Sequence, residues 1–479
     1  MMTTASNNLA PLQLDRPHVN TTWLPEPQLL FAGGMTHCDP KVGIPLYGPR
    51  SLGTNRHKHE VHVGYIGTRE SVSNARQFYH ECCEGVAGDE RHPHFPGFKA
   101  DRGFRGELRT DDRLVELISR QEQSDILTMR QPGERFEALL CLLQEKLEIL
   151  TQKDHPLDYL VLVLSQDLLR KCSTADYVVQ GVGPVHRDLR KAFKAMAMRF
   201  QKPTQLLKET TGLVPYGRKL DHKSKIAWNL FTGLYFKADG LPWGPHGLPP
   251  STCYIGVSFY RPLGESRAMR TSVAQAFDED GEGLVLRGHR FPWDEKEDGR
   301  SPHLPAELAD QLISMVLERY EKERNQLPQR VVVHKTSRFE PAEREGFEAA
   351  LRRVKRFDLV SLAPTSEARL IRAGQNPPLR GTVFTVGGVS YLYTSGYVPW
   401  LGRYPHGHVP CALQLADHVG DTSRVELMQE VLTLTKMNWN SCQMESLLPI
   451  TVRFSRLVGD ILREVPAEQT PQPKYKFYM

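Results

Sequence analysis

Basic residues gather in one stretch of a chain that is otherwise nearly neutral. Residues 186–237 contain twelve Lys or Arg and three Asp or Glu, a net charge of +9, whereas all 479 residues carry +5. Such an island is typical of proteins that bind a phosphate-rich ligand, although a solvated helix face produces the same density about as often. Within the island, Arg190 and Lys194 lie four residues apart, on one face of a predicted helix and beside its apolar stripe.

Two further residues of the island could complete a pocket for a terminal phosphate. Gln205 presents an amide at the end of this segment, and Lys237 closes a second predicted helix over residues 225–237. A phosphate monoester carries about −1.5 to −2 charges near neutrality and needs several donors. Arg offers a planar fork of donors and Lys a point charge, so these residue types fit that ligand. On spacing alone, a basic pair four residues apart is more often a surface feature.

Other polar groups offer weaker alternatives for catalysis or metal binding. Ser258 and His334 could belong to a hydrolase triad, but no nucleophile-elbow motif surrounds Ser258. The acidic run Asp278, Glu279, Asp280 and Glu282 is typical of a solvated loop. Two histidine pairs have no Cys, Asp or Glu at convincing ligand spacing, and they are His57 with His59 and His406 with His408.

Length and composition limit the class of protein. A chain of 479 residues predicts two or three domains, and 40% hydrophobic with 24% charged residues is ordinary for a globular protein. The longest apolar runs, residues 138–143 and 159–164, are far shorter than the roughly 20 residues of a membrane span. The N-terminus has no apolar signal core, and the eight cysteines form no CxxC pair. We therefore expect a cytoplasmic protein without membrane contact.

Hydrophobic periodicity predicts an α/β protein with two domains that meet near residue 245. Residues 1–22 are polar and predict a flexible tail, and residues 39–49 are turn-rich and predict a loop. A continuous apolar strand at 158–164 followed by a helix at 168–172 is typical of a parallel layer. The other predicted strands are 60–67, 253–260, 283–287, 331–333 and a hairpin over 383–392, and the other predicted helices are 134–150, 186–200, 225–237, 306–323, 424–434 and 451–462.

Several motifs, in the same order along the chain, resemble the MID and PIWI domains of prokaryotic Argonautes. The resemblance runs from about residue 28 to the C-terminus. It implies a Rossmann-like MID domain, with an N-terminal segment, in residues 23–245 and an RNase H-like PIWI domain in residues 246–479. The motifs lie at 190–194, 202–211, 226–229 and 235–243 for MID, at 254–258, 333–339 and 434–440 for PIWI, and at 30–33 and 39–49 for the start of short family members.

The resemblance assigns a site for the guide's 5′-phosphate. It consists of Arg190, Lys194, Gln205 and Lys237. Most relatives have Tyr or His at the position of Arg190, so the preference for the guide's first base stays open. In many relatives a divalent cation, expected here to be Mg²⁺, and the carboxylate of the last residue, here Met479, join this pocket.

The same resemblance argues against nuclease activity. Cleavage needs two Mg²⁺ ions held by clustered carboxylates. The corresponding positions hold Ser258 and Thr336, and Asn438 lies where the last metal ligand is expected. Hydroxyl and amide groups do not neutralise two divalent ions. The resemblance therefore implies a catalytically inactive PIWI domain, and the chain is not expected to be an enzyme.

The implied function is a guide-RNA-binding subunit that reads single-stranded target DNA by base pairing. Short relatives act with a separate APAZ-containing effector, often a sirtuin-like or TIR NADase, here expected as a 1:1 heterodimer that can assemble further on activation. Target recognition would activate the effector, deplete NAD and abort infection as antiviral defence, with no NAD bound by this chain. The alternative is a free-standing metal-dependent nuclease that uses unrecognised carboxylates.

Overall fold

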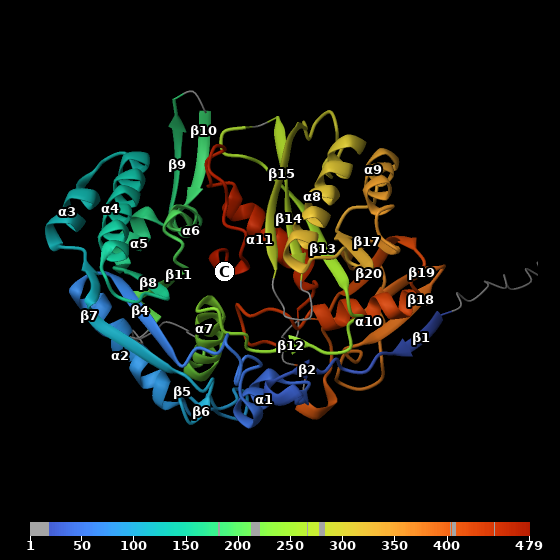
Figure 1. The fold of residues 1–479 in the computed structure, drawn as a ribbon, viewed down its shortest axis with the longest axis horizontal. Coiled ribbons are helices and arrows are strands. Elements are labelled where there is room, and N and C mark those ends of the chain that lie inside the picture. The colour runs from blue at the N-terminus through green and yellow to red at the C-terminus, as the bar shows by residue number, and fades with distance from the viewer. Residues whose placement is uncertain are drawn as a thin grey trace, which may run out of the picture.

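The structure is a computed structural model of the chain. It describes residues 19–180, 183–211, 221–265, 267–276, 283–402, 404, 409–444 and 446–479. Two sheets dominate it, a four-stranded one built from the first half of the chain and a nine-stranded one built mainly from the second half (Figure 1). The acidic run Asp278, Glu279, Asp280 and Glu282, and the pair His406 and His408, lie outside the described residues.

The smaller sheet is parallel throughout, with the strand order β11-β8-β4-β7. All six residues of β8 are buried, as its unbroken apolar sequence predicts for a strand covered on both faces. Helix α2 packs on one face of the sheet, and α4 packs on the other. The elements are β4 (Glu60–Gly67), α2 (Arg69–Glu84), β7 (Glu107–Leu117), α3 (Arg120–Thr128), α4 (Pro132–Gln152), β8 (Tyr159–Leu164), α5 (Gln166–Cys172), α6 (Leu189–Ala197), β11 (Thr204–Lys208) and α7 (Lys223–Lys237).

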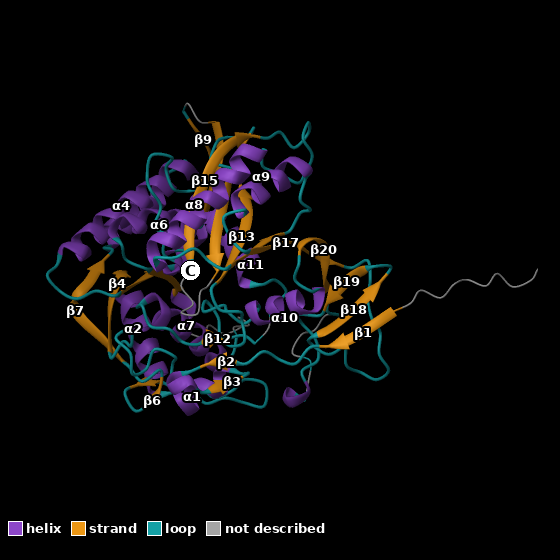
Figure 2. Ribbon diagram, turned by 45° about the vertical axis from the view of Figure 1, so that its right-hand side comes forward, coloured by secondary structure: helices purple, strands orange, loops and turns teal. Residues whose placement is uncertain are grey.

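The larger sheet has the order β1-β18-β19-β20-β17-β16-β13-β14-β15. Its pairs β13–β16 and β16–β17 are parallel, and its other pairs are antiparallel. Helices α8 and α9 cover one face, whereas α10 and α11 cover the other (Figure 2). The strands are β1 (Val19–Trp23), β13 (Thr252–Tyr260), β14 (Ala268–Ala276), β15 (Leu284–Pro292), β16 (Arg330–Lys335), β17 (Arg356–Thr365), β18 (Thr382–Val386), β19 (Val389–Leu392) and β20 (Ala412–Gly420). The helices are α8 (Ala306–Arg324), α9 (Pro341–Leu351), α10 (Arg424–Leu434) and α11 (Ile450–Leu462).

Alternation along β13 decides which helices meet which face. Cys253, Ile255 and Val257 point into the core under α8 and α9, whereas Tyr254 points to the side of α10 and α11. On that second side Gly256 lets α11 approach closely, because a Cβ there would lie 2.0 Å from the Thr451 carbonyl oxygen. Helix α11 therefore packs directly against β13, a central strand of the large sheet.

Short elements complete the fold. Two small sheets, β12-β2-β3 and β10-β9, and the hairpin β5-β6 lie outside the two main sheets. No helix in the described parts of the chain is both long and apolar enough to cross a bilayer. These short elements are β2 (Leu29–Leu30), β3 (Thr36–His37), α1 (Pro40–Tyr47), β5 (Phe98–Lys99), β6 (Arg102–Gly103), β9 (Thr174–Val179), β10 (Gly183–Asp188) and β12 (Gly244–Pro245).

Three sequence expectations about local structure were wrong. Residues 39–49 form helix α1 and not a loop, because Asp39 caps its first turn and Pro40 sits at a position where proline is tolerated. The helix expected from residue 186 begins at Leu189, since residues 183–188 pair with β9 as strand β10. Residues 19–22, assigned to the flexible tail, belong to β1, which pairs with β18. The domain boundary near residue 245 stays a prediction.

Candidate nucleic-acid interface

Helix α6 brings two of the predicted phosphate ligands into the interior. Asp188 caps its start by accepting a hydrogen bond from the Lys191 amide. The helix lies between the small sheet and α11, so most of its surface is covered, including Leu189 and Phe193. Lys194 is only 3% exposed. It belongs to the buried face, and the expectation that it lies beside the apolar stripe was wrong because the helix is covered on more than one side.

Lys194 and Lys237 converge on the start of β11. Their ammonium groups donate to the same Thr204 carbonyl oxygen, at 3.0 and 3.1 Å. Lys237, at the end of α7 and 1% exposed, also donates to Gln205 Oε1 at 2.9 Å. The Gln205 amide donates in turn to the Leu206 carbonyl at 3.0 Å. The structure thus brings together three of the predicted ligands, although they are up to 43 residues apart in the sequence.

This cluster, formed by Lys194, Lys237, Gln205 and Arg190, has an excess of positive charge. Burial lowers the pKa of Lys237 to about 7, with a further contribution from Arg190. Burial also lowers the pKa of Lys194 well below its usual value, aided by repulsion from Lys237 and Arg190. Within the described residues, no carboxylate forms an ion pair with either lysine. Two buried cations with only neutral oxygen partners are unfavourable unless an anion binds.

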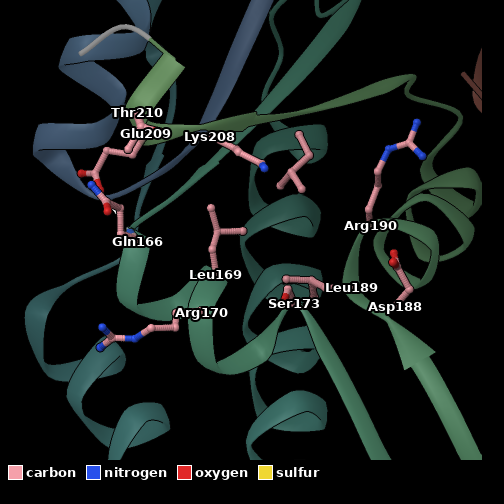
Figure 3. A pocket seen from close by; sticks show the side chains of 11 residues that line it. Gln166, Leu169, Arg170, Ser173, Asp188, Leu189, Arg190, Lys208, Glu209 and Thr210 are labelled. Atoms are coloured by element: carbon pink, nitrogen blue, oxygen red, sulfur yellow. Dashed lines mark hydrogen bonds between the residues drawn. The ribbon is translucent and has the colours of Figure 1, made fainter. Parts of the chain in front are cut away.

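Arg190 lies at the edge of this cluster and lines a cavity of about 390 Å³. Burial lowers its pKa, whereas the charges of Asp188 and Asp460 oppose that shift. Figure 3 shows Arg190 at the start of α6 and Lys208 at the end of β11 on different walls of this cavity. The remaining wall residues are Gln166, Leu169, Arg170, Ser173, Asp188, Leu189, Leu206, Glu209 and Thr210. The cavity lies at the carboxyl ends of β8 and β11, whereas Lys194, Lys237 and Gln205 gather at the start of β11 and do not line it.

The C-terminus lies near the same cluster. Figures 1 and 2 both place it beside α6, α7 and α11, and Met479 is 1% exposed. Lys476 pairs with Asp239 at 2.7 Å, just after α7, which ties the last residues to that helix. In the described structure the two buried lysines donate to Thr204 and Gln205 and not to Met479. Three cations and an amide form a donor set for an anion, and they do not fit a bare Mg²⁺ ion.

Ser258 and Thr336 line one cavity of about 620 Å³ beside two central strands of the large sheet. These strands, β13 and β16, are parallel, with Gly256 opposite His334. Asn438 does not line this cavity, because its side chain donates to Ser441 Oγ at 2.9 Å in the loop after α10. Helix α11 forms the opposing wall with Arg456 and other residues. The sequence reasoning missed these α11 residues, since no motif connects them to β13.

Of the histidine pairs considered from the sequence, His57 has hydrogen-bond partners. His57 is buried, and its ring nitrogens lie 2.8 Å from the Tyr235 hydroxyl and 2.9 Å from the Arg105 carbonyl. A different trio, Asp89, His92 and His222, has ligand atoms within 4.8 Å of one another. His222 Nδ1 accepts from the Ser224 amide at the start of α7, so this trio caps a helix and anchors a loop.

Comparisons with known proteins establish the fold. No protein-family model matches the sequence, and no curated protein sequence is significantly similar to it. Solved structures do match. Clostridium butyricum Argonaute, bound to a guide DNA and a 19-mer target DNA, gives a TM-score of 0.65 at 13% identity over 94% of this chain and 54% of its own. Drosophila Piwi gives 0.60 at 11% identity over 95% and 56%.

A third match is Aa-Ago with externally bound siRNA, at a TM-score of 0.59 and 15% identity over 95% of this chain and 56% of its own. The chain thus spans a little over half the length of these solved proteins. Identities this low establish the fold and not the activity. They confirm the predicted α/β class, a Rossmann-like MID part followed by an RNase H-like PIWI part.

Proposed function

We propose that this chain, which has an Argonaute-type fold, binds a 5′-phosphorylated guide RNA and senses complementary single-stranded DNA without cutting it. The observation that carries the proposal is the pair Lys194 and Lys237, buried together beside Gln205 with no carboxylate partner among the described residues. A terminal phosphate supplies the missing negative charge, and its oxygens accept hydrogen bonds from the remaining N–H groups of the two ammonium ions. Two of the matched solved structures contain nucleic acid. The Clostridium butyricum Argonaute structure contains a guide DNA and a target DNA, and the Aa-Ago structure contains an externally bound siRNA.

Replacement of either lysine tests this site. We expect Lys194→Ala, and separately Lys237→Ala, to weaken binding of 5′-phosphorylated RNA by about 10- to 150-fold, equivalent to about 1.5–3 kcal/mol for a charge-assisted contact. Binding of the same RNA with a 5′-hydroxyl should change little. Lys225→Ala is the matched control, because Lys225 lies on the same helix and pairs with Asp221 at 2.8 Å. Equal losses for both RNAs would assign the lysines to general backbone contact.

Inactivity of the PIWI part is the second component of the proposal. It is supported by Ser258 and Thr336 at the cavity where clustered acids would hold metal ions. We expect no guide-directed cleavage of DNA or RNA in Mg²⁺ or Mn²⁺. One product cut at a fixed distance from the guide's 5′ end would instead favour the alternative, a metal-dependent nuclease.

The third component is a partner that supplies the output. We propose a 1:1 complex with an APAZ-containing NADase, with a sirtuin-like effector ahead of a TIR effector, in which bound target DNA activates NAD hydrolysis. Stable heteromeric interfaces commonly bury about 2,000 Å² or more. The test is to co-purify this chain with the product of the neighbouring gene and to follow NAD with and without complementary DNA. A complex whose NAD turnover ignores the target would contradict the switch.

A further inference from the structure

The cavity at Ser258 and Thr336 has the opposite charge from a metal site. Its walls come from β13, β16, the loop before α8, and α11, and its volume is about 620 Å³. Four arginines line it, namely Arg261, Arg300, Arg456 and Arg463. One aspartate, Asp460, and one lysine, Lys335, also line it.

The lysine and the aspartate are already neutralised. Lys335 forms a buried ion pair with Glu343, which also accepts a hydrogen bond from the Leu304 amide. Asp460 lies 3.3 Å from Lys191 of α6. The four arginines, in contrast, form no ion pair with any residue that the structure describes. The cavity therefore keeps a local excess of about four positive charges.

The guanidinium groups keep most of their donors free. Arg456 donates one hydrogen bond, to Thr336 Oγ1 at 3.2 Å, and Arg463 donates one to the His186 carbonyl at 3.4 Å. The Nε atom of Arg463 is buried and has no hydrogen-bond partner. A guanidinium carries five N–H donors, so the site has capacity for an oxyanion with several acceptors. The neighbouring hydroxyls of Ser258 and Thr336 can add further donors.

We infer that this cavity binds a backbone phosphodiester of nucleic acid directly through its arginines, without a metal ion. The inference rests on the proposed function, since it assigns this cavity a role in holding the nucleic acid. Arginine holds phosphate oxygens in a bidentate manner, which fixes the backbone as well as attracting it. Ser258 and Thr336 stand here at the positions where the resemblance places metal-binding carboxylates, and the surrounding guanidinium groups are suited to hold the backbone directly.

The test is the double variant Arg261→Ala/Arg456→Ala in the full chain. We measure binding of 5′-phosphorylated guide RNA, and of complementary DNA to the guide-loaded protein, at several salt concentrations. The variant should bind guide RNA, complementary DNA or both about tenfold more weakly than the wild type. A plot of the logarithm of its binding constant against the logarithm of salt concentration should have a slope smaller by about 1.5, because each lost phosphate contact contributes about 0.7–0.9 to that slope. Binding by the wild type should not change in EDTA. The ratio between 5′-phosphate and 5′-hydroxyl guides should stay the same in the variant.

A matched control is Arg344→Ala/Arg353→Ala, which removes the same net charge from exposed arginines that pair with Glu348 and Glu321. Ser258→Asp is an independent variant that places a carboxylate among the arginines and should weaken binding in the absence of metal. Binding by the double variant equal to that of the control would overturn the inference and leave the guide-pocket proposal intact. A wild type without a 5′-phosphate preference would instead contradict the guide pocket.

Two further outcomes also overturn the inference. One is that inorganic phosphate raises the thermal midpoint of the wild type but not of the double variant, while nucleic-acid binding is the same in both proteins; free phosphate would then be the ligand. Disappearance in EDTA of the difference in binding between the wild type and the double variant would show that a metal ion mediates the contact at this cavity.

Discussion

Lys194 and Lys237 place positive charge where burial opposes it. Each is almost fully covered, and each donates to a neutral oxygen at the start of β11. Burial lowers the pKa of both side chains, and repulsion from Arg190 lowers each pKa further; Lys237 adds to the shift of Lys194. Under the proposed function, a bound phosphate would stabilise the charged form of both lysines. The same pair in solvent would bind phosphate with much less gain, because water would already satisfy the charges.

The lowered pKa of Lys237 predicts how guide binding depends on pH. In the free protein this lysine loses its proton above about pH 7, whereas a bound phosphate raises its pKa. Binding between pH 7 and 9 must therefore take up a proton, and the affinity for 5′-phosphorylated RNA should fall as pH rises, by up to about tenfold per unit. The measurement is equilibrium binding in this range, which lies above the phosphate's own pKa of about 6.

Two controls isolate the lysine. RNA with a 5′-hydroxyl should show little pH dependence over the same range, and Lys237→Met should lose most of the dependence seen with 5′-phosphorylated RNA. Thr204 would keep the hydrogen bond from Lys194 in that variant. An affinity that is constant or rises from pH 7 to 9 would contradict a buried lysine that gains its proton on binding.

At the scale of elements, α11 connects the two candidate sites. Its Arg456 lines the arginine cavity, and its Asp460 pairs with Lys191 of α6, the helix that carries Lys194. Just beyond α11, Glu464 is buried and pairs with Arg187 at 2.8 Å, just before α6. The position of α11 on β13 therefore affects the geometry of the cavity and of the ion pairs with α6 and Arg187.

Gly256→Ala tests the close packing of α11 against β13. The added Cβ would lie 2.0 Å from the Thr451 carbonyl oxygen, a backbone atom that cannot rotate away. We expect a loss of unfolding free energy of about 1–3 kcal/mol, as for other overpacked sites, and weaker nucleic-acid binding as α11 moves. Urea unfolding and guide binding measure the two effects.

Gly233→Ala is the matched control for that substitution. Gly233 lies inside α7, and its added Cβ would lie at an ordinary 3.7 Å from the Trp439 carbonyl oxygen. Alanine favours the helix over glycine by about 0.5–1 kcal/mol, so stability should stay equal or increase. Unchanged stability and binding in Gly256→Ala would show that α11 does not depend on this close contact.

At the scale of the whole molecule, buried charges join the first residues to the second half of the chain. Glu26 accepts hydrogen bonds from Arg380 at 2.9 Å and from Lys436 at 2.7 Å. All three side chains are at most 7% exposed. A hydrophobic cluster that extends from Leu24 to Met479 takes side chains from both halves. The two halves should therefore unfold together and not as independent units.

Glu26→Gln tests that coupling, because it leaves two buried cations without their carboxylate. We expect a loss of about 3–5 kcal/mol at pH 7 in a single urea transition. The pKa of Glu26 is lowered by Arg380 and Lys436 in spite of the opposing effect of burial. Its contribution is therefore present above the unfolded pKa near 4.5 and is lost as pH falls through the lower folded value.

The difference between wild type and Glu26→Gln should accordingly shrink below about pH 4.5. Glu60→Gln is the control, since Glu60 pairs with Arg109 at the surface and should contribute less than about 1 kcal/mol. Two separate transitions in the wild type, with only one of them shifted by Glu26→Gln, would contradict a single cooperative unit.

Local sequence patterns predicted only part of the elements, and they missed α2, α9, β7 and β17. Residues 424–434 form α10 within the predicted bounds, and the hairpin turns at Gly387 and Gly388, both with positive φ. Helix α1 was not predicted because it contains Pro45 and is stabilised by packing of the Phe31 ring against Gly43. The spacing of apolar residues indicates which face of an element is apolar. It gives no information about contacts with segments that are distant in the sequence.

The sequence by itself determined the residue types of the sites: the basic island, the amide at Gln205, and the hydroxyls at Ser258 and Thr336. Only the tertiary structure decided that Lys194 and Lys237 are buried and share one carbonyl oxygen. Only the tertiary structure brought arginines from residues 261 to 463 into one cavity. The reason is physical, since the energy of a charge depends on its burial and its neighbours, and the neighbours here come from distant parts of the chain.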